Sequence, residues 1–275
     1  MYRTQWTDEK LFSRLVNNKS KKTYWDNIII LRQRPNENIF NLAKSLLISK
    51  DANSRIVGID VLAQLGNSPR PFYKETIKLF FDLLKIEIDP KVLKSLLFAI
   101  GHNNDNLSKN QIKKLSDLKS TENILIKEGL VFSLLGVNDK NAIETLIKLS
   151  KDSTYFIRDW ATFGLGTQIE EDNEDIRNAL FARVYDKHQE TKLEAIAGLA
   201  IRKDERIKSL IIQELVNGEF SIVLLEAIEE IGDKEMLKTI EKYYKEEKNK
   251  KIPKEWLDDL KQTIKNLEKK IKNVA

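Results

Sequence analysis

The sequence contains no cysteine and only two histidines, His102 and His188. The absence of cysteine excludes disulfide bonds, thiolate metal sites and cysteine nucleophiles from this chain. A closed zinc site would need both histidines together with carboxylates from distant parts of the sequence. The motifs GxSxG, GxxxxGK(S/T), GxGxxG and HExxH are also absent, and with them the local signatures of several large enzyme classes. We therefore expect neither a metal ion nor a cofactor.

Long apolar runs are missing as well. The longest aliphatic run is Ile28–Leu31, far shorter than the ~20 apolar residues that a membrane-spanning helix needs. The first ten residues are polar and lack the apolar core of a secretion signal. Glycine and proline are few, whereas leucine, isoleucine, lysine and glutamate are abundant, which favours helix throughout. We expect a soluble, cytoplasmic protein with no membrane contact.

One helical pattern returns about every 33 residues along the chain. After Arg55, small or apolar residues follow at three-, seven- and ten-residue offsets (Gly58, Leu62 and Leu65). The same pattern, complete or shortened, starts at Pro90, Lys127, Arg158, Lys192 and Ser221. A period of this size is typical of stacked helical hairpins, each of which is too small to bury its own apolar face.

The pattern predicts an all-α fold, a right-handed α–α superhelix of about eight helix pairs that forms a single domain over residues 1–275. Inner helices are expected near 22–34, 53–65, 89–100, 121–136, 153–167, 187–201 and 219–231. Amphipathic outer helices alternate with them, and their starts carry capping residues: Thr7, Asn36, Ser108, Asp139, Asn173 and Asp233. A charged helix over 253–273 with one apolar stripe is expected to cap the last repeat.

Two acid–base pairs stand at the start of successive inner helices, Asp152 with Arg158 and Asp186 with Lys192. The segment DSTYFIRDWATFGLG around the first pair resembles the signature of HEAT repeats, especially the bacterial HEAT-like repeats related to those of phycobilin lyases. The resemblance implies that these four residues form a polar ladder between neighbouring repeats. It is weaker where Pro90 replaces the base and Thr121 the acid. The resemblance specifies fold rather than function, because HEAT-like arrays serve as scaffolds, adaptors, lyases and DNA glycosylases.

Offsets of one, five and nine residues from each anchor fall on the side of the helix opposite the core, where a concave groove is expected. Acidic residues dominate these positions, with only Lys91 opposing them; the acids are Asp60, Glu128, Asp159, Glu226 and Glu230. Phe132 and Phe163 occupy the middle of the groove, and Trp160 and Glu194 lie at its edge. Packing under a neighbouring helix remains open for all three aromatic residues.

The predicted groove is therefore acidic and partly aromatic, which suits a basic protein partner through charge and cation–π contact. Nucleic acid is an unlikely partner, since phosphate binding requires lysine and arginine. The net charge of +5 comes from residues 234–275, which hold thirteen lysines and eight acidic residues. We expect a non-enzymatic, monomeric scaffold or adaptor.

Two alternatives stay open. One is a protein that neutralises a toxin or enzyme by binding it. The other is a HEAT-like DNA glycosylase, for which Tyr155, Asp159, Trp160 and Phe163 supply the residue types, although no basic cluster accompanies the aspartate. Lyase activity has no sequence feature of its own here.

Overall fold

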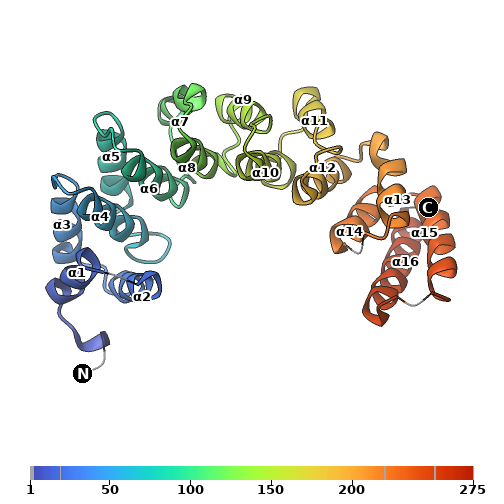
Figure 1. Ribbon diagram of the computed structural model, residues 1–275, viewed down its shortest axis with the longest axis horizontal. Coiled ribbons are helices and arrows are strands. Elements are labelled where there is room, and N and C mark those ends of the chain that lie inside the picture. The colour runs from blue at the N-terminus through green and yellow to red at the C-terminus, as the bar shows by residue number, and fades with distance from the viewer. Residues whose placement is uncertain (1–2, 19, 220, 251, 275) are drawn as a thin grey trace. The chain divides into compact units, whose positions relative to one another are not determined.

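The computed structural model describes residues 3–18, 20–219, 221–250 and 252–274. Within these ranges the chain is all-α and forms no strand. Helices follow one another in pairs joined by short loops, which is the α-solenoid architecture that the repeat pattern predicts (Figure 1). The chain divides into two compact units, residues 1–142 and 143–275. That the two act as one domain over 1–275 stays a prediction.

Unit 1 is built from two rows of helices. The odd-numbered row contains α1 (Asp8–Val16), α3 (Glu37–Leu46), α5 (Tyr73–Leu84) and α7 (Lys109–Ser116). The even-numbered row contains α2 (Lys21–Arg32), α4 (Ala52–Gln64), α6 (Pro90–Gly101) and α8 (Ile124–Leu134). Consecutive helices of the even-numbered row pack on each other, α2 on α4, α4 on α6 and α6 on α8 (Figure 1). These four helices overlap the first four predicted inner ranges.

Unit 2 repeats the arrangement, and α9 starts at the last residues of unit 1. Its odd-numbered helices are α9 (Lys140–Leu149), α11 (Glu174–Phe181), α13 (Lys208–Val216) and α15 (Lys234–Glu247). Its even-numbered helices are α10 (Tyr155–Phe163), α12 (Gln189–Ile201), α14 (Ile222–Ile231) and α16 (Lys254–Val274). Here α10 packs on α12, α12 on α14 and α14 on α16. The charged terminal helix expected over 253–273 is α16, and it covers α14 and α15.

Helix starts follow from local side-chain chemistry. The hydroxyl of Thr7 and the amide oxygen of Asn36 accept hydrogen bonds from the free N–H groups of the first turns of α1 and α3. Ser108 and Gln111 form a reciprocal capping box at α7. The side-chain oxygens of Asn173 and Asp233 accept hydrogen bonds from backbone N–H groups in the first turns of α11 and α15. The sequence predicts these caps, and the structure confirms them.

The periodic apolar residues form the core of each unit. Leu62, Leu97 and Leu130 are buried in unit 1, and Leu165 and Leu199 are buried in unit 2. Each such side chain contributes about 1.5–3 kcal/mol when it is fully removed from water. Because consecutive even-numbered helices pack on each other within each unit, this burial is shared between repeats rather than completed within one hairpin.

Glycine allows two helices of unit 2 to approach closely. A Cβ atom on Gly198 of α12 would collide with the Cα of Gly166, which lies in the single π-helical turn Gly164–Gln168 that follows α10. The close contact of the two backbones explains why a glycine occupies this position. A glycine inside a helix otherwise costs about 1 kcal/mol relative to alanine.

Two bases of the predicted polar ladder, Arg158 and Lys192, pair with acids outside their own helices. Arg158 donates two hydrogen bonds to the carboxylate of Asp186, 2.7 and 2.9 Å long, and so ties one repeat to the next. Arg158 also donates to the backbone carbonyl of Asp152, and the carboxylate of Asp152 accepts from the backbone N–H of Thr154. Lys192 pairs with Glu214 of α13, at 3.0 Å, where the sequence pairs it with Asp186. Unit 1 contains an equivalent link at the first anchor, where Arg55 donates two hydrogen bonds to Glu87.

Arg202, just after α12, is a feature that sequence reasoning did not find. Its side chain is buried. The guanidinium donates to five backbone carbonyls, at 2.7 to 3.0 Å; they belong to Leu165, Gly166, Ile169, Glu171 and Gly198. The cation therefore satisfies carbonyl groups that the π-helical turn and the ends of two helices leave without intrahelical partners.

Candidate functional site

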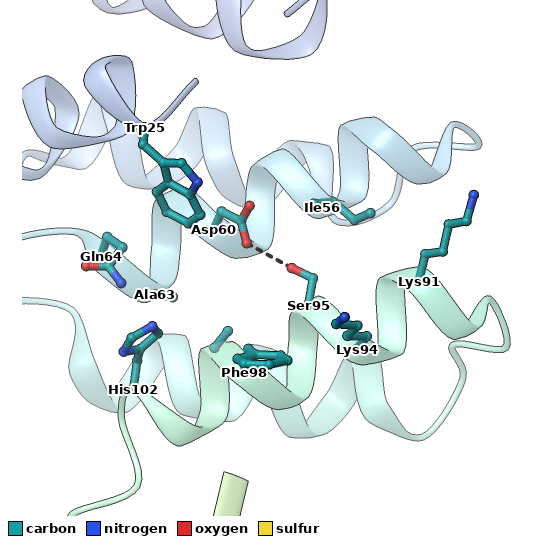
Figure 2. A pocket seen from close by; sticks show the side chains of 11 residues that line it. Trp25, Ile56, Asp60, Ala63, Gln64, Lys91, Lys94, Ser95, Phe98 and His102 are labelled. Carbon is teal, nitrogen blue, oxygen red and sulfur yellow. Dashed lines mark hydrogen bonds between the residues drawn. The ribbon is translucent and has the colours of Figure 1, made fainter. Parts of the chain in front are cut away.

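The groove positions predicted on the second and third inner helices line one pocket of unit 1. Its volume is about 280 Å³. All six of those positions contribute to its wall: Ile56, Asp60, Gln64, Lys91, Ser95 and Ala99. Five further residues complete it: Trp25, Ala63, Lys94, Phe98 and His102. Helices α2, α4 and α6 thus hold this site between them (Figure 2).

Asp60 is the central polar residue of the pocket. One carboxylate oxygen accepts a 2.7 Å hydrogen bond from the hydroxyl of Tyr24. The other accepts a 2.8 Å hydrogen bond from the hydroxyl of Ser95 (Figure 2). Burial raises the pKa of Asp60 above its usual range, although both hydrogen bonds favour the ionised form. The same arrangement raises the pKa of Tyr24, by burial and by the adjacent charge of Asp60.

Basic side chains around the pocket do not neutralise Asp60. The ammonium of Lys94 lies 2.7 Å from the carboxylate of Glu128 on α8, and it also approaches the ring of Phe98. Burial and the nearby Arg70 lower the pKa of His102, so its imidazole is neutral at pH 7. Lys91 is exposed and extends away from Asp60 in Figure 2.

Glu128 and Phe132, both predicted to face the partner, have contacts within unit 1. Glu128 holds the ion pair with Lys94. The ring of Phe132 lies 4.3 Å from that of Phe98, measured between centroids, at an angle of 30°. Both side chains are half-buried. A partner that used Glu128 would have to compete with Lys94.

The predicted groove residues of α10 and α12 form a second cluster, in unit 2. Asp159 accepts a 3.2 Å hydrogen bond from the hydroxyl of Thr191, and burial raises its pKa. Burial raises the pKa of Glu194 too, and the charge of Asp159 adds to this effect. The charge of Asp159 thus disfavours ionisation of Glu194, and the nearby charges of Glu190 and Asp186 disfavour ionisation of Asp159.

Aromatic rings stand beside these acids. Trp160 and Phe163 meet edge to face, with centroids 5.5 Å apart and an angle of 87° between the rings. Each is half-buried, so each contributes both to packing and to the surface. Tyr155, one turn earlier, stacks on the imidazole of His188 at 4.4 Å. The nearby base Arg158 is occupied by Asp186.

The remaining predicted acids, Glu226 and Glu230, are exposed on α14. Over the described ranges of the chain, no salt bridge involves the side chains of Asp159, Glu194, Glu226 or Glu230. By contrast, the acids of the polar ladder are paired, as in the bond from Arg158 to Asp186, which lowers the pKa of that carboxyl. We call these four unpaired acids with Trp160 and Phe163 the acidic face of unit 2.

The groove positions predicted from the sequence do not include five residues that line the pocket, namely Trp25, Ala63, Lys94, Phe98 and His102. They also do not include Tyr24, which donates to Asp60. A signal for Tyr24 existed, because it precedes Asp60 by 36 residues, about one repeat. The inner helix predicted near 22–34 contains Tyr24 and Trp25, but the groove offsets start only at Arg55. His102 follows the last residue of α6, beyond the offsets that define the groove.

Residues 3–18, 20–219, 221–250 and 252–274 contain no group of three or more histidine, aspartate or glutamate side chains arranged to hold a metal ion. Among the helices that the structure describes, none combines the length and apolarity required to cross a bilayer.

Comparison with known proteins supports the architecture. No family model matches the chain. Over 116 residues, 42% of this chain, the sequence is 35% identical to protein YibA of Escherichia coli K12, and equally to YibA of E. coli O157:H7. The matched region spans 41% of the length of these relatives.

Solved structures extend the likeness along the chain. The X-ray structure of E. coli YibA aligns with a TM-score of 0.76 over 96% of this chain and 93% of that chain, at 21% identity. An engineered protein aligns with a TM-score of 0.52 over 94% of this chain and 78% of its own, at 17% identity. At these identities the similarity shows an all-helical repeat fold and leaves the ligand of this chain open.

Proposed function

We propose that this chain is a non-enzymatic HEAT-like scaffold that binds a basic segment of a partner protein on the acidic face of unit 2. The observation that supports the proposal is the lack of internal salt bridges at Asp159, Glu194, Glu226 and Glu230. Acids that stabilise this fold, such as Asp186, are paired with a base. Carboxylates without a salt bridge leave negative charge that a cationic partner can complement.

The aromatic residues of the face support the same class of partner. Lysine and arginine side chains are attracted to the rings of tryptophan and phenylalanine, with about 0.5–1 kcal/mol at exposed sites and more when water is excluded. Rings and carboxylates held on packed helices are largely pre-organised, so little ordering entropy is lost when a partner binds. A cytoplasmic location and a monomeric state are part of this proposal.

The test compares binding of a fluorescent lysine- and arginine-rich peptide to the protein and to the double variant Glu226→Gln/Glu230→Gln. Both substitutions lie on exposed positions, so folding is expected to be unchanged by circular dichroism. We expect a loss of affinity of about tenfold, corresponding to 1.4 kcal/mol, and a strong decrease of binding at raised ionic strength.

A matched control removes two exposed acids elsewhere, Glu37 and Glu75, which lie in α3 and α5 of unit 1. The variant Glu37→Gln/Glu75→Gln changes the net charge by the same amount. Equal losses in the two double variants would show attraction to the overall charge instead of binding at the acidic face, and the proposal would be wrong.

A further inference from the structure

The pocket of unit 1 differs from the acidic face of unit 2 because its charge is enclosed. Its acid is single, half-buried and held by two hydroxyl groups, whereas Glu226 and Glu230 are exposed. At about 280 Å³ the pocket lies just below the range of roughly 300–1,000 Å³ in which drug-sized ligands and cofactors bind. A single side chain is the appropriate size of occupant.

The hydrogen bonds to Asp60 leave acceptor capacity on both oxygens. A carboxylate offers about four acceptor positions, and Tyr24 and Ser95 use one on each oxygen. One position therefore remains on each oxygen, and Lys94, a base that lines the pocket, is paired with Glu128 instead. A donor with two parallel N–H groups matches this pair, as in the fork of a guanidinium on a carboxylate.

The side chains that line the pocket suit the flat face and the methylene chain of an arginine side chain. Trp25, with 40% of its surface exposed, and Phe98 lie on α2 and α6 beside Asp60 (Figure 2). Aromatic faces stack on the planar guanidinium, which is less strongly hydrated than an ammonium. Ile56 and Ala63 supply apolar surface for a methylene chain. His102, neutral for the reasons given above, adds no opposing charge.

We propose that this pocket binds one arginine side chain, presented by a polypeptide, with its guanidinium on the free acceptor positions of Asp60 and against the exposed ring of Trp25. The inference concerns unit 1 and stands independently of the acidic face of unit 2. The pocket is proposed to recognise one type of residue, whereas the acidic face is proposed to attract a segment that carries several positive charges.

The experiment follows the indole N–H resonance of Trp25 by NMR during titration with Nα-acetyl-arginine N-methylamide. The control ligand is the corresponding citrulline derivative, which has nearly the same shape without the charge. We expect saturable shifts with the arginine compound and affinity at least about tenfold weaker for the citrulline compound. The variant Trp25→Phe assigns the resonance. Equal responses to the two ligands, or no response to either, would overturn the proposal.

Two variants locate the interaction. Asp60→Asn keeps an acceptor for one of the two hydroxyl groups, presents an N–H donor to the other, and removes the charge. It is expected to abolish the preference for arginine over citrulline. Glu122→Gln removes an acid of unit 1 whose side chain is 93% exposed, and it is expected to leave the preference unchanged. Because the wild-type comparison needs neither variant, poor folding of one does not decide the outcome.

A last arm distinguishes the source of the guanidinium. Agmatine carries the same group on a free amine and lacks the backbone of a peptide. Weaker binding of agmatine than of the capped arginine supports an arginine within a polypeptide. Tighter binding of agmatine would contradict it and identify a small guanidino compound as the occupant. Failure of this experiment leaves the test of the acidic face unaffected, since the two use different residues and probes.

Discussion

The hydroxyl of Tyr24 donates a 2.7 Å hydrogen bond to Asp60, a residue in the next repeat. Ser95, one repeat further on, donates to the other carboxylate oxygen. Three successive helices of the even-numbered row are thus joined at one carboxyl group. Its raised pKa makes the joint sensitive to pH.

Stability should reflect this sensitivity. The pKa of Asp60 is higher in the folded than in the unfolded chain, so the protonated carboxyl favours folding. This contribution to the free energy of unfolding is complete below the unfolded pKa and is lost as the pH rises through the folded pKa. We expect the wild type to gain stability relative to Asp60→Asn as the pH falls from neutrality through the folded pKa. Denaturant unfolding of both proteins across this pH range measures it. A constant difference across the range would contradict the prediction, and Glu122→Gln provides the reference for an exposed acid.

Removal of the ladder should destabilise unit 2. Arg158→Ala deletes two charge-assisted hydrogen bonds to Asp186 and leaves that buried carboxylate without its main partner. We expect a loss of about 2–3 kcal/mol in the free energy of unfolding. The exposed pair of Lys113 and Asp117 is the control, and Lys113→Ala should cost less than about 1 kcal/mol. Similar losses for the two substitutions would show that the ladder is no more than a surface ion pair.

The ladder also predicts that the stability of the fold decreases at low pH. The bonds from Arg158 hold the pKa of Asp186 below its usual range. The stability that Asp186 provides is therefore present above its unfolded pKa and is lost as the pH falls through its folded pKa. Asp186→Asn should flatten the acid limb of the stability profile, a change measurable by thermal unfolding at successive pH values. An unaltered acid limb would mean that other carboxyl groups determine it.

Close contact of two backbones should make Gly198 intolerant of substitution. A methyl group there would meet the Cα of Gly166 and the side chain of Leu180. We expect Gly198→Ala to destabilise the protein by about 1–3 kcal/mol through overpacking, despite the higher helix propensity of alanine. Gly136 has open space around it but a φ of 73°, so Gly136→Ala should cost about 1 kcal/mol through backbone strain alone. Stabilisation by Gly198→Ala, seen as a higher denaturation midpoint, would disprove the contact.

The buried guanidinium of Arg202 should be difficult to replace. Arg202→Met preserves much of the volume and removes the donors to all five carbonyls. Backbone acceptors would then remain buried without partners, with a cost of about 1–3 kcal/mol for each group that water cannot reach. We expect a large loss of stability by denaturant unfolding, together with faster amide hydrogen exchange in α12. Normal exchange in α12 of the variant would show that water substitutes for the guanidinium.

Sequence alone determined the helices, their caps and the core, because these depend on local chemistry and on a period that the chain repeats. Thr7, Asn36 and Ser108 could be recognised as caps since a cap acts within its own first turn. The period also brought Asp60 and Ser95 to one side of their helices, since residues at equal offsets in stacked helices share a face.

Only the tertiary structure decided which of those side chains meet. It paired Glu128 with Lys94, directed Lys192 to Glu214, and brought Tyr24 and Trp25 of α2 beside the pocket. The reason is geometric. The helical period determines on which face of a helix a side chain lies. A contact of 2.7 Å depends in addition on side-chain length, rotamer and the offset between neighbouring repeats. The repeat pattern of the sequence does not give these quantities.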